Sequence, residues 1–267
     1  MRLNPLDYWT VFVLRKLRPY MTVGSILRYR TVLGRVRKGK TRPDSPLLLH
    51  MKVPTRHTIC LREGWPDFDS FGEIFIRDVY GIVVDHITDC RTIIDLGGNI
   101  GLAALYFAIK YPQSRIVSVE PLPQNFQLLW RNLEGLISSR RCMPLQAAVW
   151  SSAKNLVADP SKPAERYNAF AVREPAAGTS ADGPVSGLTM ATIIGQSGFG
   201  AIDLVKIDIE GAETELFRGD LDWLTQTRAV AIEFHGDSRR GCGFDGIMER
   251  FGFKVVNDND HTVLATK

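Results

Sequence analysis

The 267-residue chain is 45% hydrophobic and 23% charged with a formal net charge of +4, values that suit one large globular domain with extensions. Its four cysteines are scattered without a C-x-x-C pair, which argues against a disulfide framework or a zinc site and fits a reducing compartment. No apolar run reaches the roughly 18 residues of a membrane span, and the start lacks the features of a secretory signal, so we expect a cytoplasmic protein.

Residues 1–43 form a basic arm. Its first 42 positions contain eleven Lys or Arg residues and a single acidic residue, Asp7. Trp9, Phe12 and Tyr20 alternate with these charges at roughly helical spacing. Three roles fit such a segment: a helix that packs its apolar face on its own domain, a contact with an anionic membrane surface at the inner face of the membrane, or a nucleic-acid contact, which we favour least.

Residues 44–90 are predicted to form a cap ahead of the main sheet. A loop signal rich in proline and aspartate opens the segment. Two short apolar runs, residues 47–51 and 57–61, predict a pair of strands, and residues 68–86 carry apolar side chains close to helical period. The N-terminal part of the chain is therefore expected to be a helical and hairpin extension.

Residues 91–267 alternate buried apolar runs with helical segments, which predicts an α/β, Rossmann-like fold. The expected strands are residues 92–95, 115–120, 142–147, 202–209 and 229–234, and an antiparallel hairpin of residues 254–256 and 262–265 closes the chain. The expected helices include residues 100–111, 123–133, 188–194 and 244–251. Residues 151–187 interrupt this order with Ser, Ala, Pro and Gly, and we interpret them as a hairpin-plus-loop insertion over the substrate side.

The first of these strands runs into a glycine turn of the kind found in nucleotide sites. Asp95 to Gly101 read DLGGNIG, and the second strand ends on Glu120, about 20 residues after the last glycine. Glycines allow a tight turn and a close approach of the backbone to a ligand, and an acid at this place accepts hydrogen bonds from ribose hydroxyls. The G-x-G-x-x-G run that a dinucleotide pyrophosphate requires is missing, so the turn favours a nucleoside ligand.

Polar side chains mark the ends of two strands that are expected to be neighbours. Lys206, Asp208 and Glu210 stand at period two, and the following strand ends with Glu233 and His235. Ligands of open α/β sheets bind at the carboxyl ends of strands. The candidate catalytic residues are therefore Asp208, Glu210, Glu233 and His235. Negative neighbours raise the pKa of a histidine and make it a stronger base, so His235 is the first candidate for a general base and Asp208 the second.

Two alternatives remain for these groups. The four groups could bind a divalent metal, in which case three carboxylates and one imidazole would favour Mg²⁺ or Mn²⁺ over Zn²⁺, although we do not favour a metal site. Alternatively, Lys206 and Asp208 form a structural ion pair and Glu210 caps the next helix.

Four motifs give the chain a family resemblance. They are DLGGNIG, the pair Glu120-Pro121, the run DLVKIDIEGAE from Asp203 to Glu213, and E-x-H ending at His235. Together they resemble the FkbM family of S-adenosylmethionine (SAM)-dependent methyltransferases over about residues 60–235. The resemblance implies a class I methyltransferase fold with a seven-stranded sheet, SAM as methyl donor, and a hydroxyl acceptor on a sugar, glycolipid or polyketide.

The chain departs from the family pattern at two places. Gly98 stands where the family commonly has alanine, which loosens the turn without abolishing binding. Thr189-Met190-Ala191 stands where the family often has a Leu-Asp pair, so the cover over the substrate is expected to differ. The basic arm lies outside the resemblance.

The resemblance also assigns roles around SAM. Backbone groups of the turn would hold the methionine end with Asp95 ordering the turn, and Glu120 would accept the ribose hydroxyls. The adenine would lie near Leu122, Asn125, Ala147 and Ala148. The expected cofactor-binding residues are Asp95, Gly97, Gly98, Asn99, Gly101, Glu120, Pro121, Leu122, Asn125, Ala147 and Ala148.

The sequence therefore predicts a SAM-dependent O-methyltransferase that acts on a hydroxyl of a small molecule or glycoconjugate. One alternative is an RNA methyltransferase that uses the basic arm, but the N/D-P-P-aromatic motif of amino-group methyltransferases is replaced by IDIEG. The other is a non-catalytic SAM-fold binding protein, which is disfavoured because the ribose acid and the strand-end polar residues are all present.

Overall fold

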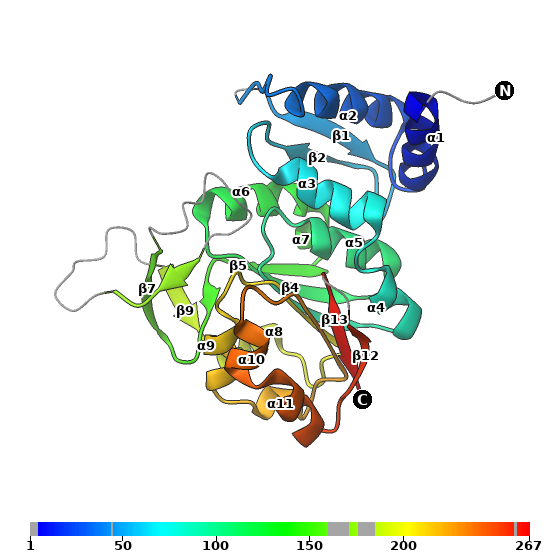
Figure 1. The fold of residues 1–267 in the computed structure, drawn as a ribbon. Coiled ribbons are helices and arrows are strands. Elements are labelled where there is room, and N and C mark those ends of the chain that lie inside the picture. The colour runs from blue at the N-terminus through cyan, green and yellow to red at the C-terminus, as the bar shows by residue number, and fades with distance from the viewer. Residues whose placement is uncertain (1–4, 44, 160–170, 176–184, 259–260) are drawn as a thin grey trace. The chain divides into compact units, whose positions relative to one another are not determined.

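A computed structural model describes residues 5–43, 45–159, 171–175, 185–258 and 261–267 (Figure 1). The chain divides into two compact units, Met1–Val79 and Tyr80–Lys267. The basic arm and most of the predicted cap thus share one unit. Among the described residues, no helix combines the length and the apolar character that crossing a bilayer requires.

The first unit is built from helices around a two-stranded sheet. Its elements are α1 (Pro5–Leu17), α2 (Val23–Val36), β1 (Leu47–Met51), β2 (His57–Leu61), α3 (Asp67–Phe71) and the π-helix η1 (Gly72–Arg77). The two strands pair antiparallel with the predicted bounds. The hydroxyl of Thr22 caps α2 by accepting a hydrogen bond from the Ser25 N–H, and the inner face of α2 buries Tyr29 against Phe68 and Phe71.

The predicted helical structure of residues 68–86 is divided into three separate helices. The chain forms α3, then η1, and then α4 (Gly81–His86) in the second unit. Asp78 adopts a left-handed conformation with φ of 60°, and its N–H bonds to the Glu73 carbonyl to end the π-helix. A left-handed residue cannot continue a right-handed helix, which explains the break.

The second unit contains a seven-stranded sheet in the order β12-β13-β11-β10-β3-β4-β5. Its strands are β3 (Thr92–Leu96), β4 (Arg115–Val119), β5 (Cys142–Leu145), β10 (Leu204–Ile207), β11 (Ala229–Ile232), β12 (Lys254–Asp258) and β13 (Val263–Thr266). The first five are parallel, whereas β13 runs antiparallel to both β11 and β12. This confirms the predicted seven-stranded, mostly parallel sheet with a C-terminal antiparallel hairpin.

Helices cover both faces of this sheet (Figure 1). One layer contains α4, α5 (Leu102–Lys110), α6 (Pro123–Asn132) and α7 (Glu134–Ser138). The other contains α8 (Met190–Ser197), α9 (Glu213–Arg218), η2 (Asp222–Leu224), α10 (Ser238–Cys242) and α11 (Phe244–Arg250). The central strands β10 and β11 are buried at every residue, as expected for parallel strands between two helical layers. Helices α7 and α10 are additions to the predicted set.

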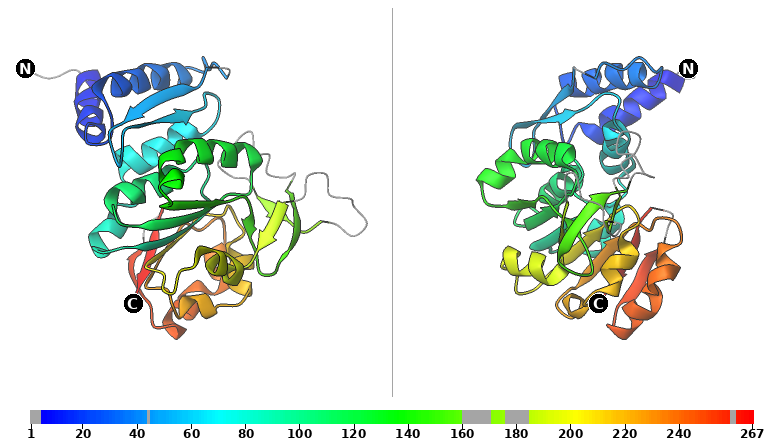
Figure 2. Two further views of the ribbon diagram at one scale, coloured as in Figure 1. Left: turned by 180° about the vertical axis from the view of Figure 1, so that it is seen from behind. Right: turned by 90° about the vertical axis from the view of Figure 1, so that its left-hand side faces the viewer.

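A smaller sheet replaces part of the expected insertion. It has the order β6-β9-β7-β8, with β6 (Ala148–Val149), β7 (Lys154–Ala158), β8 (Val172–Arg173) and β9 (Val185–Leu188). Because β6 follows β5 after only two residues, this sheet lies beyond the carboxyl end of β5, as the view from behind shows (Figure 2). The remainder of the predicted hairpin and loop, residues 160–170 and 176–184, lies outside the described residues.

The turn after β3 passes very close to the end of β10. Gly97 has a φ of +77°, and a Cβ atom built on it would lie 1.7 Å from the backbone oxygen of Asp208. A Cβ on Gly98 would lie 2.3 Å from the Ser118 hydroxyl and 2.7 Å from Leu129. Ser118 on β4 and Leu129 on α6 thus occupy the space that the methyl group of an alanine at position 98 would need. Glycine at this position allows both elements to pack closely against the turn.

We predict that Gly97→Ala destabilises the protein by more than about 4 kcal/mol, because a methyl group at this position overlaps a backbone oxygen that cannot rotate away. Gly252→Ala is the matched control, since Gly252 has nearly the same φ of +79° but a methyl group there would meet nothing within 4 Å. The control should lose only about 1–2 kcal/mol of unfolding free energy, which is the cost of a left-handed backbone conformation for alanine. Urea unfolding of both variants measures the difference, and equal losses would contradict the close approach.

Candidate active site

The carboxyl ends of four adjacent strands meet where the sheet order reverses. The order β11-β10-β3-β4 places β3 at this reversal, with β4 on one side and β10 on the other. Open α/β sheets bind their ligands in the crevice at such a point. Asp95 near the end of β3, Glu120 after β4, Asp208 after β10 and His235 after β11 all come from this edge of the sheet.

The ammonium group of Lys206 connects β10 to the glycine turn. Its Nζ lies 3.1 Å from Asp95 Oδ1, 3.7 Å from Asp208 Oδ2, and donates a hydrogen bond of 2.7 Å to the Gly97 carbonyl. Burial lowers the pKa of Lys206, but the negative charges around it, Asp95 first, outweigh burial and raise the pKa, so the group stays charged. The expected pair with Asp208 is present, although Asp95 is the closer partner.

Asp95 is fully buried beside this cation and is held from a second side. Its Oδ2 accepts a hydrogen bond of 2.7 Å from the hydroxyl of Ser118 on β4. The N–H groups of Gly97 and Gly98 both donate to the carbonyl of Val119 at the end of the same strand. Asp95 thus joins β3 to its neighbours on both sides, to β4 through Ser118 and to β10 through Lys206.

Glu120 binds the turn through both carboxylate oxygens. Oε2 accepts a hydrogen bond of 2.8 Å from the Asn99 N–H, and Oε1 accepts one of 2.9 Å from the Leu122 N–H. Only 4% of Glu120 is exposed, and burial raises its pKa to about 7 against the lowering effect of these two bonds and of Lys206. A carboxylate oxygen has two lone pairs, so each oxygen can still accept a further hydrogen bond from a ligand.

The other predicted cofactor residues surround this turn or lie near it in the chain. Pro121 and Leu122 follow β4 directly, and Asn125 is a buried residue of α6. Gly101 starts α5 with a φ of +86°, and a Cβ there would lie 2.9 Å from Leu133. A side chain at position 101 would therefore collide with Leu133, which explains why this position is a glycine.

Ala147 and Ala148 occupy the link between the two sheets. Ala147 belongs to the main hydrophobic core, and Ala148 starts β6 and packs with Trp150 and Leu156 in a smaller cluster. Ile209 touches both groups of apolar residues. The small sheet thus packs next to the loop that carries Asp208 and Glu210.

The strand β10 ends earlier than expected, at Ile207. Asp208 and Glu210 therefore do not continue its alternation but belong to a turn, in which Glu210 has a φ of 54° and Gly211 a φ of 101°. These left-handed residues reverse the chain direction before α9 begins at Glu213. The turn, rather than the pleat of a strand, brings the Glu210 carboxylate beside His235.

His235 contacts three carboxylates. Its Nε2 lies 3.3 Å from Glu210 Oε2 and 3.8 Å from Asp208 Oδ1, and its Nδ1 lies 2.9 Å from Glu213 Oε1. Glu213 is completely buried and also accepts a hydrogen bond from the Gly211 N–H. The carboxylate of Glu213 accepts a hydrogen bond from the Nδ1–H of His235, so Nε2 faces the other two acids.

Glu233 differs from the predicted arrangement. The three groups that converge are Asp208, Glu210 and His235, whereas Glu233 lies 3.4 Å from the Nδ1 of His261. The antiparallel register explains this difference: Ile232 pairs with Val263, which places Glu233 beside the residues that precede β13. The prediction of four groups at one point is wrong for Glu233, and Glu213 takes its place against His235.

The charge state of His235 follows from this environment. Burial lowers its pKa, but the hydrogen bond to Glu213 and the charges of Glu210 and Asp208 outweigh burial and raise the pKa to about 9. The ring is thus a strong base whose neutral form becomes abundant only as the pH approaches 9. One ligand atom from each of Asp208, Glu210 and His235 lies within 4.8 Å of the others, a spacing that could also hold a divalent cation.

Sequence reasoning missed Glu213, Ser118 and His261. Glu213 carried a usable signal, because an acid at the start of a short buried helix needs a partner. Ser118 is a polar residue inside an otherwise apolar buried strand, which is a similar signal. His261 has none, since only the pairing of β13 with β11 brings it to Glu233.

Comparison with known proteins identifies this arrangement. The family model described as the methyltransferase FkbM domain matches residues 95–255, which is more than half of the chain. The chain belongs to the FkbM methyltransferase family. The matched segment runs from the aspartate of the glycine turn to β12 and contains all the site residues discussed above except His261, which lies just beyond it. It does not include the first unit.

Two relatives of this methyltransferase cover most of its length. Methyltransferase sdnD of Sordaria araneosa is 29% identical over 216 aligned positions, and the alignment covers 70% of this chain and 82% of sdnD. The hexuronic acid methyltransferase AglP of Haloferax volcanii is 27% identical over 198 aligned positions, and the alignment covers 72% of this chain and 75% of AglP. The crystal structure of methyltransferase FkbM from Methylobacillus flagellatus KT is 16% identical with a TM-score of 0.47, and the match covers 67% of this chain and 44% of that one.

We predict that Lys206→Met costs about 3–5 kcal/mol of unfolding free energy, because it leaves the buried Asp95 without its counter-ion. Lys154→Met is the matched control: its ion pair with Glu174 is partly exposed and should contribute less than about 1 kcal/mol. Urea unfolding of Lys206→Met, Asp95→Asn and the double variant measures the coupling. Strictly additive losses would show that the two charges do not depend on each other.

Proposed function

We propose that this methyltransferase transfers the methyl group of SAM to a hydroxyl group of a sugar or another small molecule or glycoconjugate. The observation that supports this most strongly is that two structural features lie at one edge of the sheet. They are the glycine turn, whose backbone N–H groups bind Glu120, and the hydrogen-bonded pair of His235 and Glu213. The first suits a nucleoside and the second suits proton removal from an acceptor. The relative named as a hexuronic acid methyltransferase supports a sugar-type acceptor.

The residues around the turn fit SAM. Glu120 keeps free lone pairs for the two ribose hydroxyls, while the backbone of Gly97 and Asn99 would face the methionine end. The turn lacks the glycine pattern for a pyrophosphate, which SAM does not have. Bound SAM supplies an electrophilic methyl group on a positively charged sulfonium. We assign the adenine side to Leu122, Asn125, Ala147 and Ala148.

His235 would remove the proton from the acceptor hydroxyl. An alcohol is a poor nucleophile until its proton has an acceptor, and the Nε2 of His235 is the basic atom turned away from Glu213. Glu213 would hold the ring and stabilise the imidazolium that forms. Asp208 and Glu210 would orient the acceptor and stabilise the same positive charge, and Glu233 with His261 would lie at the edge of the acceptor side.

A second version of the mechanism replaces the base by a cation. The spacing of Asp208, Glu210 and His235 favours it, because a histidine whose Nδ1 is held by a buried carboxylate is a common arrangement in metal sites. Two carboxylates and one imidazole would suit Mg²⁺ or Mn²⁺. In this version Asp208, Glu210 and His235 would hold the cation, which would lower the pKa of the acceptor hydroxyl, and His235 would not act as the base.

We predict that SAM binds with a pH dependence set by Glu120. Because the pKa of Glu120 is about 7, the carboxylate gains a proton below this pH and loses acceptor capacity, so SAM affinity should fall about tenfold from pH 8 to pH 6. In Glu120→Gln the affinity should be at least about tenfold weaker at pH 8 and independent of pH. Calorimetry measures both constants.

NAD serves as the control ligand in a thermal-shift assay at the same concentrations. SAM should raise the melting temperature and NAD should not, since the turn lacks a pyrophosphate site. A shift with NAD alone would overturn the proposed cofactor.

We predict that His235→Gln retains SAM affinity but lowers kcat by about 10²–10⁴. In the wild type, kcat/KM should rise with pH up to about 9, because only the neutral ring accepts a proton. Glu213→Gln should move this rise to lower pH, since it removes the hydrogen bond and charge that raise the His235 pKa. His86→Gln, a change in an exposed histidine on α4, is the control and should keep the wild-type profile.

The cation version gives a different result. EDTA would abolish turnover, Mg²⁺ or Mn²⁺ would restore it, and Asp208→Asn and Glu210→Gln would be as damaging as His235→Gln. An enzyme that tolerates both EDTA and His235→Gln would exclude both versions.

A further inference from the structure

The solvent side of α2 carries an unusual combination of side chains. Its inner face is buried, whereas residues that recur at helical spacing form one outward stripe. We call this set the outer stripe; it extends into the turn after the helix and consists of Val23, Leu27, Arg30, Thr31, Gly34 and Lys38. Its first half is apolar and its second half is basic, so the stripe is amphipathic along its length.

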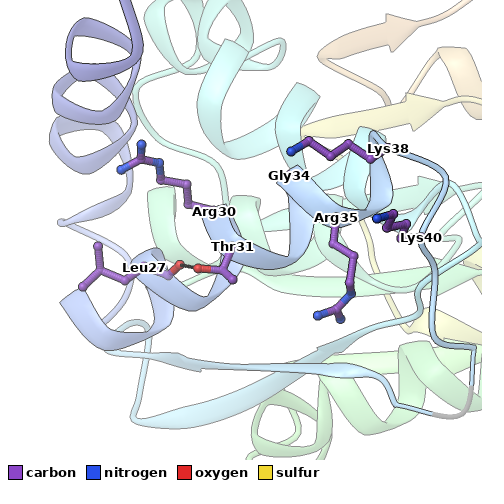
Figure 3. A pocket seen from close by; sticks show the side chains of 7 residues that line it. All are labelled: Leu27, Arg30, Thr31, Gly34, Arg35, Lys38 and Lys40. Carbon is purple, nitrogen blue, oxygen red and sulfur yellow. Dashed lines mark hydrogen bonds between the residues drawn. The ribbon is translucent and has the colours of Figure 1, made fainter. Parts of the chain in front are cut away.

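A hollow of about 580 Å³ opens over the basic half of the outer stripe (Figure 3). Gly34 lines it without a side chain, and a Cβ at this position would meet nothing within 4 Å. Arg30 and Lys38 flank the glycine one helical turn to either side, and Lys40 also lines the hollow. Arg35 also lines the hollow (Figure 3), but its guanidinium is already paired with Glu63.

The positive charge of this surface has little compensation. Residues 8–43 contain ten Lys or Arg residues and no acidic residue. Among the residues that the structure describes, none forms an ion pair with Arg30, Lys38 or Lys40, while the buried Glu63 is already bound to Arg35 and to the Arg42 N–H. The other three cations around this open hollow therefore attract an anionic group, and a phosphate accepts hydrogen bonds from both Arg and Lys side chains.

Apolar exposure is concentrated in the same part of the chain. Seven large hydrophobic side chains are exposed among the described residues, and four of them belong to α1 and α2. Val23 is 50% exposed and Leu27 is 48% exposed, and both belong to the outer stripe. Aliphatic side chains contribute nothing to contacts with a phosphodiester backbone, but they gain free energy on entering the boundary between lipid headgroups and acyl chains.

We propose that the outer stripe of α2 docks on the surface of an anionic lipid bilayer. Val23 and Leu27 enter the headgroup boundary, and Arg30, Lys38 and Lys40 contact lipid phosphates around the hollow over Gly34. This inference goes beyond the methyl transfer reaction, because the first unit lies outside the family match. A membrane-attached enzyme would meet acceptors that are themselves anchored in the bilayer.

The test measures sedimentation of the full-length protein with vesicles of phosphatidylcholine and phosphatidylserine, and with vesicles of phosphatidylcholine alone. The wild type should sediment only with the anionic vesicles, and less as salt increases. Because each cation near such a surface strengthens binding about fivefold, the triple variant R30Q/K38Q/K40Q should bind roughly 100-fold more weakly. V23S/L27S should also weaken binding, by about tenfold or more, without reducing SAM affinity.

The charge-matched control is R131Q/R250Q/K254Q, which removes three exposed cations from the second unit and should bind vesicles like the wild type. Circular dichroism and SAM affinity check that every variant is folded. Equal losses in the two triple variants would show a dependence on net charge alone and overturn the proposed surface. Wild-type binding by V23S/L27S, or salt-sensitive binding to an RNA oligonucleotide without binding to vesicles, would also overturn it.

Discussion

The buried ion pair between Lys206 and Asp95 is the interaction on which the strand-end geometry depends. A cation in the middle strand of a parallel sheet is costly unless it is fully paired. Lys206 is paired by Asp95 and Asp208 and by the carbonyl of Gly97. In return it holds β10, β3 and the glycine turn in one arrangement, because each partner belongs to a different part of this edge. The glycine turn and the cluster around His235 are thus parts of one electrostatic network, because Asp208 contacts both Lys206 and His235.

His235, at the other end of this network, is strongly basic, but its neutral form is scarce at neutral pH. Three carboxylates raise the pKa of His235 to about 9 although burial opposes them, so the ring binds a proton strongly and releases it reluctantly. Glu213 is central to this balance. It is fully buried, and its Oε2 has no hydrogen-bond partner among the described residues, an arrangement that costs free energy.

The two units of the chain carry different kinds of chemistry. The second unit contains the family domain with its strand-end site, and the first unit contains a basic, partly apolar helical surface outside the family match. Part of the basic arm packs into its own unit, since Tyr29 contacts Phe68 and Phe71. The apolar residues of α2 recur at helical spacing, and most of them lie on its buried face. The exposed face therefore consists of cations and a few aliphatic side chains.

The sequence by itself determined the strands of the large sheet and most of the helices between them, the glycine turn, the acid after β4 and the presence of polar groups after β10 and β11. These features follow from local patterns: apolar periodicity, the conformational freedom of glycine and the alternation of side chains along a strand. Only the tertiary structure decided which polar groups meet. Glu213 reaches His235 because left-handed residues at Glu210 and Gly211 reverse the chain, and Glu233 reaches His261 because β13 pairs antiparallel with β11. Turn geometry and strand register depend on contacts between distant segments, which no local pattern encodes.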